Sequence, residues 1–171
     1  SIIQKLVDAD AIVLAKTNLH ELAFGITSTN PTFGFVKNPY DTSKISGGSS
    51  GGTAAAIAAG IAPVGLGTDT GGSTRVPAAL CGIVGMRPSV GNGGKDRRYS
   101  GDGVLPISHT RDTIGVMASS VQDIALLDGF LNNEEAAEII DLKGIRIGIP
   151  KEYFEDRGYS TLLAYDEMIL K

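Results

Sequence analysis

The chain has 171 residues, of which 42% are hydrophobic, and its mean hydropathy is +0.09. These values are typical of a water-soluble globular protein that is long enough for one domain with a real core. The formal net charge of −4 and the isoelectric point near 5.1 give no electrostatic footprint for nucleic acid. We therefore expect no nucleic acid as a partner. Because no apolar run approaches the length of a membrane span, we expect no membrane as a partner either.

Cys81 is the single cysteine of the chain. A lone cysteine excludes a disulfide within the chain and a cysteine-based zinc site. Its neighbours, Leu80, Gly82 and Ile83, favour a small buried side chain over a reactive thiol. A single thiol fits a reducing compartment, so we expect a cytoplasmic protein.

The first part of the chain predicts short elements and one long loop. Apolar residues at helical spacing predict a helix over residues 2–8, and the unbroken apolar run at 11–14 predicts a short buried strand. A short helix is expected over residues 19–24, with Asn18 as its N-cap. Residues 26–46 are rich in Thr, Ser, Asn, Gly and Pro and predict a loop.

The middle of the chain alternates between helices and strands. Residues 53–60 predict a helix with one face of small side chains, and residues 64–68 predict a strand. A second short helix is expected over 74–80. Residues 88–112 are rich in loop-forming residues, and 120–130 predict an amphipathic helix with Asp123 in its first turn.

The last part of the chain predicts a strand over residues 145–150, ended by Pro150, and a helix over 161–171. Strands that alternate with helices predict the α/β class. There are no internal repeats.

Two serines bordered by glycines are the most distinctive feature of the sequence. Ser49 lies within Gly47–Gly52, and Ser73 directly follows Gly71 and Gly72. Glycine loses more conformational entropy on folding than other residues, so clustered glycines indicate special backbone angles or a close approach to a ligand. Packing alone is a poor explanation for two such blocks joined by an alanine-rich helix and a short strand.

These two blocks closely resemble the amidase signature family. The resemblance covers most of residues 1–150, its signature core is 46–90, and its matching segments are 16–18, 21–23, 46–56, 65–78 and 85–88. Within the family, the chain is most similar to mandelamide hydrolase, through segments 89–94, 97–99 and 106–112. The resemblance implies a mixed sheet sandwiched by helices.

The resemblance also implies amide hydrolysis by a Ser–Ser–Lys triad that needs neither a metal nor a cofactor. Ser73 corresponds to the nucleophile, and Ser49 to the bridging serine, which a cis peptide joins to Gly48 in the family. The implied oxyanion hole consists of the backbone N–H groups of Thr70, Gly71 and Gly72. The expected reaction proceeds through an acyl-enzyme and converts a small, aryl primary amide to a carboxylate and ammonia. The expected partner is this small-molecule amide, and a homodimer is one oligomeric state open to the protein.

The lysine of the family's triad has no counterpart in the chain. It precedes the Gly-Ser-Ser-Gly block, and Ser1 aligns after that point, whereas Lys16 matches a later Lys-Thr-Asn motif. We therefore expect residues 1–171 to be a single partial domain, truncated at both ends and inactive by itself. Such a fragment is also expected to expose apolar surface.

Three further residues are expected to support the site. Ser50 precedes an expected helix, so its hydroxyl either caps that helix or supports the site. Asp69 and Arg75 flank the second serine block and are interpreted as an ion pair or a set of hydrogen bonds that fixes the turn.

Three alternatives remain. Residues 47–51 also satisfy Gly-x-Ser-x-Gly, the nucleophile elbow of α/β-hydrolases, with Asp102 and His109 as partners; residues 41–46 are a poor match for the apolar strand this elbow requires. A glutaminase-like subunit of a tRNA-dependent amidotransferase shares both serine blocks. The third alternative is a non-catalytic module whose glycine loop binds an anion, although the Gly-Lys-Ser/Thr of a P-loop is absent.

Overall fold

The computed structural model describes residues 1–135, 143–146 and 148 of the chain. Contacts divide the chain into two units, Ser1–Ala137 and Glu138–Lys171, and the fold below is that of the first unit. Half of the strand expected at 145–150 lies outside the described residues, and the helix expected at 161–171 lies wholly outside them.

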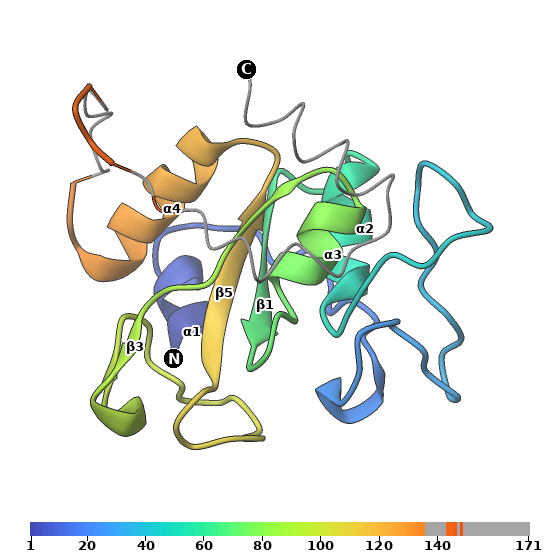
Figure 1. The fold of residues 1–171 in the computed structure, drawn as a ribbon, viewed down its shortest axis with the longest axis horizontal. Helices are drawn as coiled ribbons and strands as arrows, with labels where there is room; N and C mark the ends of the chain where they lie inside the picture. Colours follow the sequence, from blue (N-terminus) through green and yellow to red (C-terminus); the bar gives the residue numbers. More distant parts are fainter. Residues whose placement is uncertain (136–142, 147, 149–171) are drawn as a thin grey trace. The chain divides into compact units, whose positions relative to one another are not determined.

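Short helices and strands alternate along the first unit (Figure 1). In chain order the elements are α1 (Ile2–Val7), the 3₁₀ turn η1 (Glu21–Ala23), α2 (Gly51–Ala58), β1 (Val64–Asp69), α3 (Arg75–Leu80), β2 (Val84–Met86), β3 (Val90–Gly91), the 3₁₀ turn η2 (Asn92–Gly94), β4 (Asp96–Arg97), β5 (Thr113–Ala118) and α4 (Val121–Asn132). The expected α/β class is therefore confirmed.

A three-stranded sheet of order β1-β5-β2 forms the centre of the unit. Both neighbours of β5 run antiparallel to it, and Gly67 lies opposite Gly115 in the register of β1 and β5. The described residues thus contribute antiparallel pairs, where the resemblance implied a mixed sheet. The sequence analysis missed β5 itself, although all six of its residues are buried.

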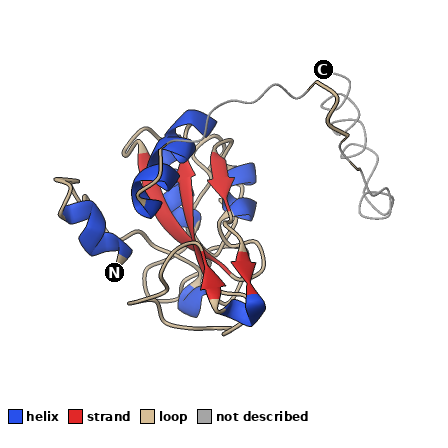
Figure 2. Cartoon of the chain, turned by 90° about the vertical axis from the view of Figure 1, so that its left-hand side faces the viewer, coloured by secondary structure: helices blue, strands red, loops and turns tan. Residues whose placement is uncertain are grey.

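Helices cover both faces of this sheet (Figure 2). On one face, Val116 and the other even-numbered residues of β5 pack with Ile2 of α1 and with Ile124 of α4. On the opposite face, Met117 packs with α2 and with Cys81, which is fully buried as expected. The alternation of side chains along a strand accounts for this division, and the sandwich of helices around the sheet is confirmed.

The face toward α2 and α3 carries glycines in all three strands. A Cβ atom added to Gly67 would lie 2.6 Å from Ser50 Oγ, and one added to Gly85 would lie 2.6 Å from the Cβ of Ala78. A Cβ on Gly115 would lie 2.8 Å from the backbone oxygen of Met86. These distances leave no space for side chains, so glycine allows the two helices to lie directly against the strands.

The Gly115→Ala substitution is expected to destabilise the protein by roughly 1–3 kcal/mol, because the added methyl group would meet backbone that cannot rotate away. Gly101→Ala is the matched control, since a Cβ on Gly101 has nothing within 4 Å. The two free energies of unfolding, measured in urea, should differ clearly. Equal effects of the two substitutions would contradict this role for the glycine face.

The strand expected at 11–14 is absent, and its side chains are exposed; Ile12 is 84% and Leu14 is 64% exposed. A strand forms only where another strand takes its backbone hydrogen bonds, and no described residue pairs with this segment. The helix expected over 19–24 is reduced to η1, because Leu22 has a left-handed φ of 55°. Asn18 does not cap it: the residue at the N-cap is His20.

The other helices expected within the described residues, and the strand expected over 64–68, are confirmed. α2 begins at Gly51, slightly before its expected start, and α3 and β1 agree closely with their predicted ranges. In α4, the Ser120 side chain accepts a hydrogen bond from the Asp123 backbone, 3.1 Å, as a good N-cap does. The expected loop at 26–46 contains one isolated bridge, between Lys37 and Ile45.

Apolar side chains are widely exposed over residues 12–40, as expected. The most exposed aromatic residues there are Phe24, Phe33, Phe35 and Tyr40, each more than 70% exposed.

Candidate active site

The loop that carries Ser49 is buried. Residues 46–50 are all buried, and Ser49 itself is 1% exposed. The Gly48–Ser49 peptide bond is cis, as the resemblance implied. The Ser49 carbonyl oxygen accepts a hydrogen bond from the His20 backbone, 3.0 Å, while Ser49 Oγ has no hydrogen-bond partner among the described residues.

The two serine blocks meet through their backbones. The N–H of Ser50 donates to the carbonyl oxygen of Ser73, 3.1 Å. Ser73 is partly exposed and lies two residues before the start of α3. Residues far apart in sequence are therefore adjacent at this point, as the signature pattern required.

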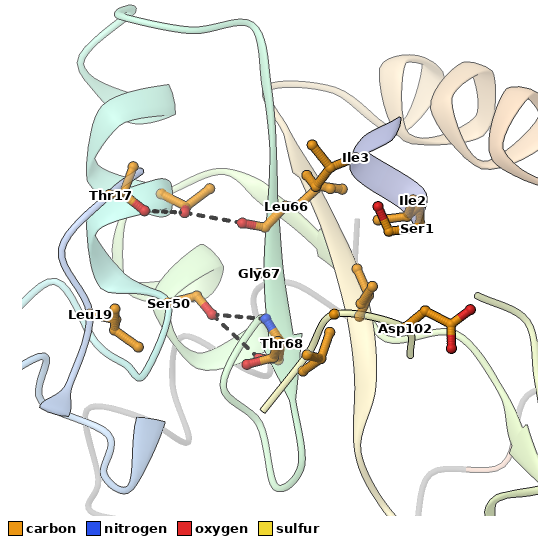
Figure 3. A pocket seen from close by; sticks show the side chains of 14 residues that line it. Ser1, Ile2, Ile3, Thr17, Leu19, Ser50, Leu66, Gly67, Thr68 and Asp102 are labelled. Atoms are coloured by element: carbon orange, nitrogen blue, oxygen red, sulfur yellow. Dashed lines mark hydrogen bonds between the residues drawn. The ribbon is translucent and has the colours of Figure 1, made fainter. Parts of the chain in front are cut away.

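The Ser50 hydroxyl does not cap α2, so the capping interpretation is wrong. Its Oγ lies 3.2 Å from the backbone nitrogen of Thr68 and 3.3 Å from the oxygen of the same residue (Figure 3). Thr53 makes a similar bond to the oxygen of Leu66, 3.2 Å. Both side chains thus attach the beginning of α2 to the free edge of β1.

Ser28 is a second hydroxyl of this loop, and the sequence analysis missed it. It is fully buried and lies within hydrogen-bond distance of the backbone of Gly47, Ser49 and Gly51. Nothing in its Thr- and Ser-rich surroundings distinguished it from an ordinary loop residue.

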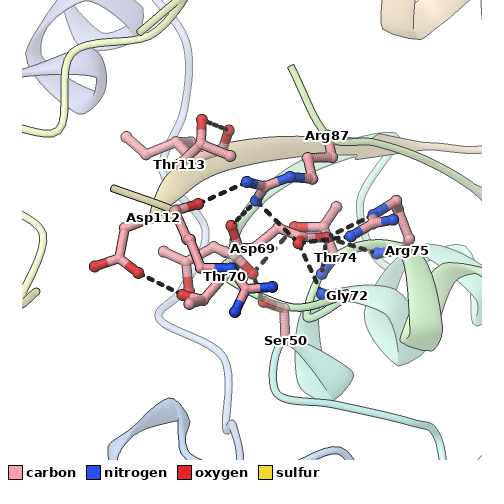
Figure 4. Close-up of polar contacts among 12 residues, drawn as sticks. Ser50, Asp69, Thr70, Gly72, Thr74, Arg75, Arg87, Asp112 and Thr113 are labelled. Carbon is pink, nitrogen blue, oxygen red and sulfur yellow. Dashed lines mark hydrogen bonds and ion pairs between the residues drawn. The ribbon is translucent and has the colours of Figure 1, made fainter. Parts of the chain in front are cut away.

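Asp69 lies at the centre of a polar cluster beneath the second serine block (Figure 4). Its carboxylate is fully buried and accepts from the backbone of Gly72, 2.8 Å, and of Thr74, 3.2 Å. Arg75 forms the expected ion pair with it, Nε to Oδ2 3.1 Å. The sequence analysis missed a second cation, Arg87, whose Nη1 lies 3.1 Å from Oδ1. Arg87 lies in segment 85–88, which matches the amidase signature family, but the match assigned no role to this residue.

These contacts keep Asp69 ionised. Burial raises the pKa of its carboxyl, but the hydrogen bonds from Arg75, Gly72 and Thr74 together with the Arg75 charge lower it more. The net pKa therefore lies below its ordinary value. An ionised carboxylate that holds the N–H of Gly72 fixes the turn before Ser73.

The three residues of the expected oxyanion hole differ in their contacts. The N–H of Gly72 is occupied by Asp69, so it would have to leave this partner to meet an oxyanion. Gly71 is exposed, and a Cβ added to it would have nothing within 4 Å. Thr70 Oγ1 donates to Asp112 Oδ1, 2.5 Å, which ties the turn to the loop before β5.

The nucleophile-elbow alternative is wrong. No strand precedes Ser49 over residues 41–46, although the elbow requires one. His109 and Asp102 are both exposed, and the unpartnered Ser49 Oγ bonds to neither.

A cavity of about 290 Å³ lies beside β1 (Figure 3). Its wall is largely apolar, from Leu19, Leu66, Val104 and Ile114, while Thr17, Ser50 and Thr53 contribute hydroxyl groups. Within the described part of the chain, no group of three or more His, Cys, Asp or Glu residues is arranged to hold a metal ion. No described helix is long and apolar enough to cross a membrane.

The fold and the site define an α/β protein in which two glycine-bordered serine segments meet beside a buried aspartate. A family model described as Amidase matches residues 1–164. The chain belongs to the amidase family.

Two named relatives differ in activity. The chain is 48% identical to an indoleacetamide hydrolase of Allorhizobium ampelinum over 170 residues, which are 99% of this chain and 36% of the relative. It is 41% identical to a subunit of the glutamyl-tRNA(Gln) amidotransferase of Methanosarcina acetivorans over 167 residues, 90% of this chain and 34% of that one.

A solved structure described as "Crystal structure of amidase" superimposes with a TM-score of 0.84 at 42% identity, covering 98% of this chain and 37% of that one. The chain thus spans little more than a third of the length of these relatives. They do not confirm the narrower likeness to mandelamide hydrolase.

Proposed function

We propose that the chain is part of an enzyme that hydrolyses the C–N bond of a small primary amide to a carboxylate and ammonia. The proposal rests on membership of the amidase family and on relatives named indoleacetamide hydrolase. An aryl acetamide is the preferred substrate class, because an indole ring is the side chain that this name implies.

The buried, unpartnered hydroxyl of Ser49 is the observation that carries the proposal. A buried polar group without a hydrogen bond costs about 1–3 kcal/mol, which favours a partner in the working enzyme. A lysine amine fits this position, because a desolvated lysine loses its proton readily and can act as a base. In this proposal, the lysine belongs to a part of the full-length protein outside residues 1–171.

The proposed reaction runs in two halves. The lysine takes the Ser49 proton while Ser49 takes that of Ser73, and Ser73 Oγ attacks the amide carbonyl carbon. The proton then returns through Ser49 to the leaving nitrogen, the C–N bond breaks, and ammonia departs. Water attacks the acyl-enzyme by the same route, which releases the carboxylate and restores the Ser73 hydroxyl.

The negative charge on the carbonyl oxygen needs hydrogen-bond donors. We assign this role to the N–H groups of Thr70, Gly71 and Gly72, where the Gly72 N–H exchanges its bond to Asp69 for one to the oxyanion. One donor of this type contributes about 3 kcal/mol to lowering the barrier. Asp69, Arg75 and Ser50 support the turn and do not take part in the chemistry.

A glutaminase-like subunit of an amidotransferase is the second candidate, and the amidotransferase relative supports it. Such a subunit would release ammonia from glutamine by the same two serines. Both candidates use the same chemistry. They differ in the amide that supplies the ammonia and in the molecule that accepts it.

Ammonia release by the natural full-length protein tests these candidates. Indole-3-acetamide, mandelamide and L-glutamine are supplied in turn, without a partner protein. Release from an aryl acetamide supports the hydrolase, and release confined to glutamine supports the amidotransferase subunit. No release from any of the three, with tight phosphate binding, would favour the anion-binding module. The 171-residue chain by itself is expected to release none.

A further inference from the structure

We propose that Ser28 is a positioning residue for Ser49, holding the Gly47–Gly51 loop in its working conformation through one buried hydroxyl. This inference rests on the proposed function, in which Ser49 carries protons.

The hydroxyl of Ser28 contacts three backbone groups of the loop. Its Oγ lies 2.7 Å from the carbonyl oxygen of Gly47 and 3.2 Å from that of Ser49, and it accepts from the N–H of Gly51, 3.1 Å. Because a hydroxyl has one proton, it donates to one carbonyl at a time and accepts from Gly51 throughout. One side chain therefore joins both sides of the Gly48–Ser49 bond to the first turn of α2.

Gly48 and Gly51 lie so close to Ser28 that neither position has space for a side chain. A Cβ on Gly51 would overlap Ser28 Oγ, and one on Gly48 would lie 2.9 Å from the Ser28 backbone nitrogen. Ser28 has φ +53°, a left-handed conformation that is uncommon for residues other than glycine. Its carbonyl oxygen accepts from the Val36 N–H, 3.1 Å, so the backbone of its own segment holds it in place.

Ser49 depends on these contacts because its own side chain makes none among the described residues. Its backbone is fixed through its carbonyl oxygen, which receives the His20 N–H at 3.0 Å and lies beside Ser28 Oγ. The orientation of its hydroxyl thus follows from the loop. Displacing a catalytic group by about 1 Å can cost about 10²-fold in rate.

The leaving group distinguishes a positioning role from a purely structural one. Ammonia cannot leave an amide without a proton, which Ser49 delivers in the proposed cycle, whereas p-nitrophenolate leaves an ester unprotonated. A misplaced Ser49 should therefore slow amide hydrolysis more than hydrolysis of the p-nitrophenyl ester of the same acid. General loss of folded protein would slow both reactions equally.

Ser28→Ala in the natural full-length protein tests the inference, with Ser46→Ala as the matched control. Ser46 is also fully buried, and its Oγ lies within donating distance of Gly47 O, 3.1 Å, and of Val36 O, 3.3 Å, but no bond joins it to Ser49 in the described part of the chain. For Ser28→Ala we expect kcat on the amide to fall about 10- to 100-fold, with KM within about 3-fold of wild type. The loss on the ester should be at least about 3-fold smaller than the loss on the amide, because the ester needs Ser49 only for the attack steps and not for its leaving group. Ser46→Ala should leave the amide-to-ester ratio unchanged.

Several results would overturn the inference: equal losses on amide and ester, an unchanged amide rate, or the same ratio change in Ser46→Ala. If Ser28→Ala does not fold, Ser28→Gly replaces it, because glycine adopts a left-handed φ without strain. Wild-type protein that hydrolyses no amide would instead defeat the proposed function, and the inference with it. An active wild type with an unaltered Ser28 variant defeats the inference alone.

Discussion

Ser73→Ala is expected to lower amide hydrolysis by the natural full-length protein by at least about 10⁴-fold, because no acyl-enzyme can form without its hydroxyl. The segment that carries Ser73 contacts the Ser49 loop, because the Ser50 N–H donates a hydrogen bond to the Ser73 carbonyl oxygen. Ammonia release under saturating substrate measures kcat, and thermal unfolding confirms that the variant is folded. Ser43→Ala is the control: this serine is exposed and, among the described residues, bonds only to Asp41.

Ser49→Ala should cause a loss of similar size, and the double variant should be no worse than either single one. Residues that act as one catalytic unit give such non-additive effects. If the activity loss of the double variant equalled the product of the two single losses, the two serines would act separately. Retention of more than a few per cent of wild-type activity in Ser73→Ala would place the nucleophile elsewhere.

Asp69→Asn is expected to destabilise the protein by roughly 1–3 kcal/mol, the usual cost of leaving buried hydrogen-bonding groups without a partner, because the carboxylate is fully buried while the Arg75 side chain is 51% exposed. The substitution leaves the Arg75 and Arg87 guanidinium groups without the carboxylate that both contact. It also replaces an oxygen acceptor of the Gly72 or Thr74 N–H with an NH₂ group. Urea denaturation measures the change. Asp41→Asn is the control, because that carboxylate is exposed and, within the part of the chain that the structure describes, bonds only to Ser43, so stability should change little.

The same carboxylate gives an expected pH dependence. Its pKa is lower in the folded protein than in the unfolded chain, so its stabilising contribution is present above the unfolded pKa and is lost as the pH falls through the folded pKa. Wild-type stability should therefore fall below about pH 4, and Asp69→Asn should show a shallower fall. Parallel acid profiles, or an Asp69→Asn variant as stable as wild type, would contradict a structural role for the buried carboxylate.

Sequence alone determined the features that depend on local pattern. The glycine-bordered serines identified the two segments that the fold brings together, because few other structures require that spacing. Helical periodicity, with Asp123 in the first turn, placed α4, and the pattern of residues 64–68 placed β1. Asp69 and Arg75 are near neighbours in sequence, so their ion pair could be anticipated.

Tertiary structure decided the features that depend on distant partners. β5 became the central strand because β1 and β2 pair with both of its edges, whereas residues 11–14, equally apolar, find no pairing strand among the described residues. Arg87 reaches Asp69 only after β2 takes its place in the sheet. Ser28 acquires its role when a separate glycine loop folds around it. Local sequence does not predict such contacts, because they join segments that are far apart in the chain and meet only when it folds.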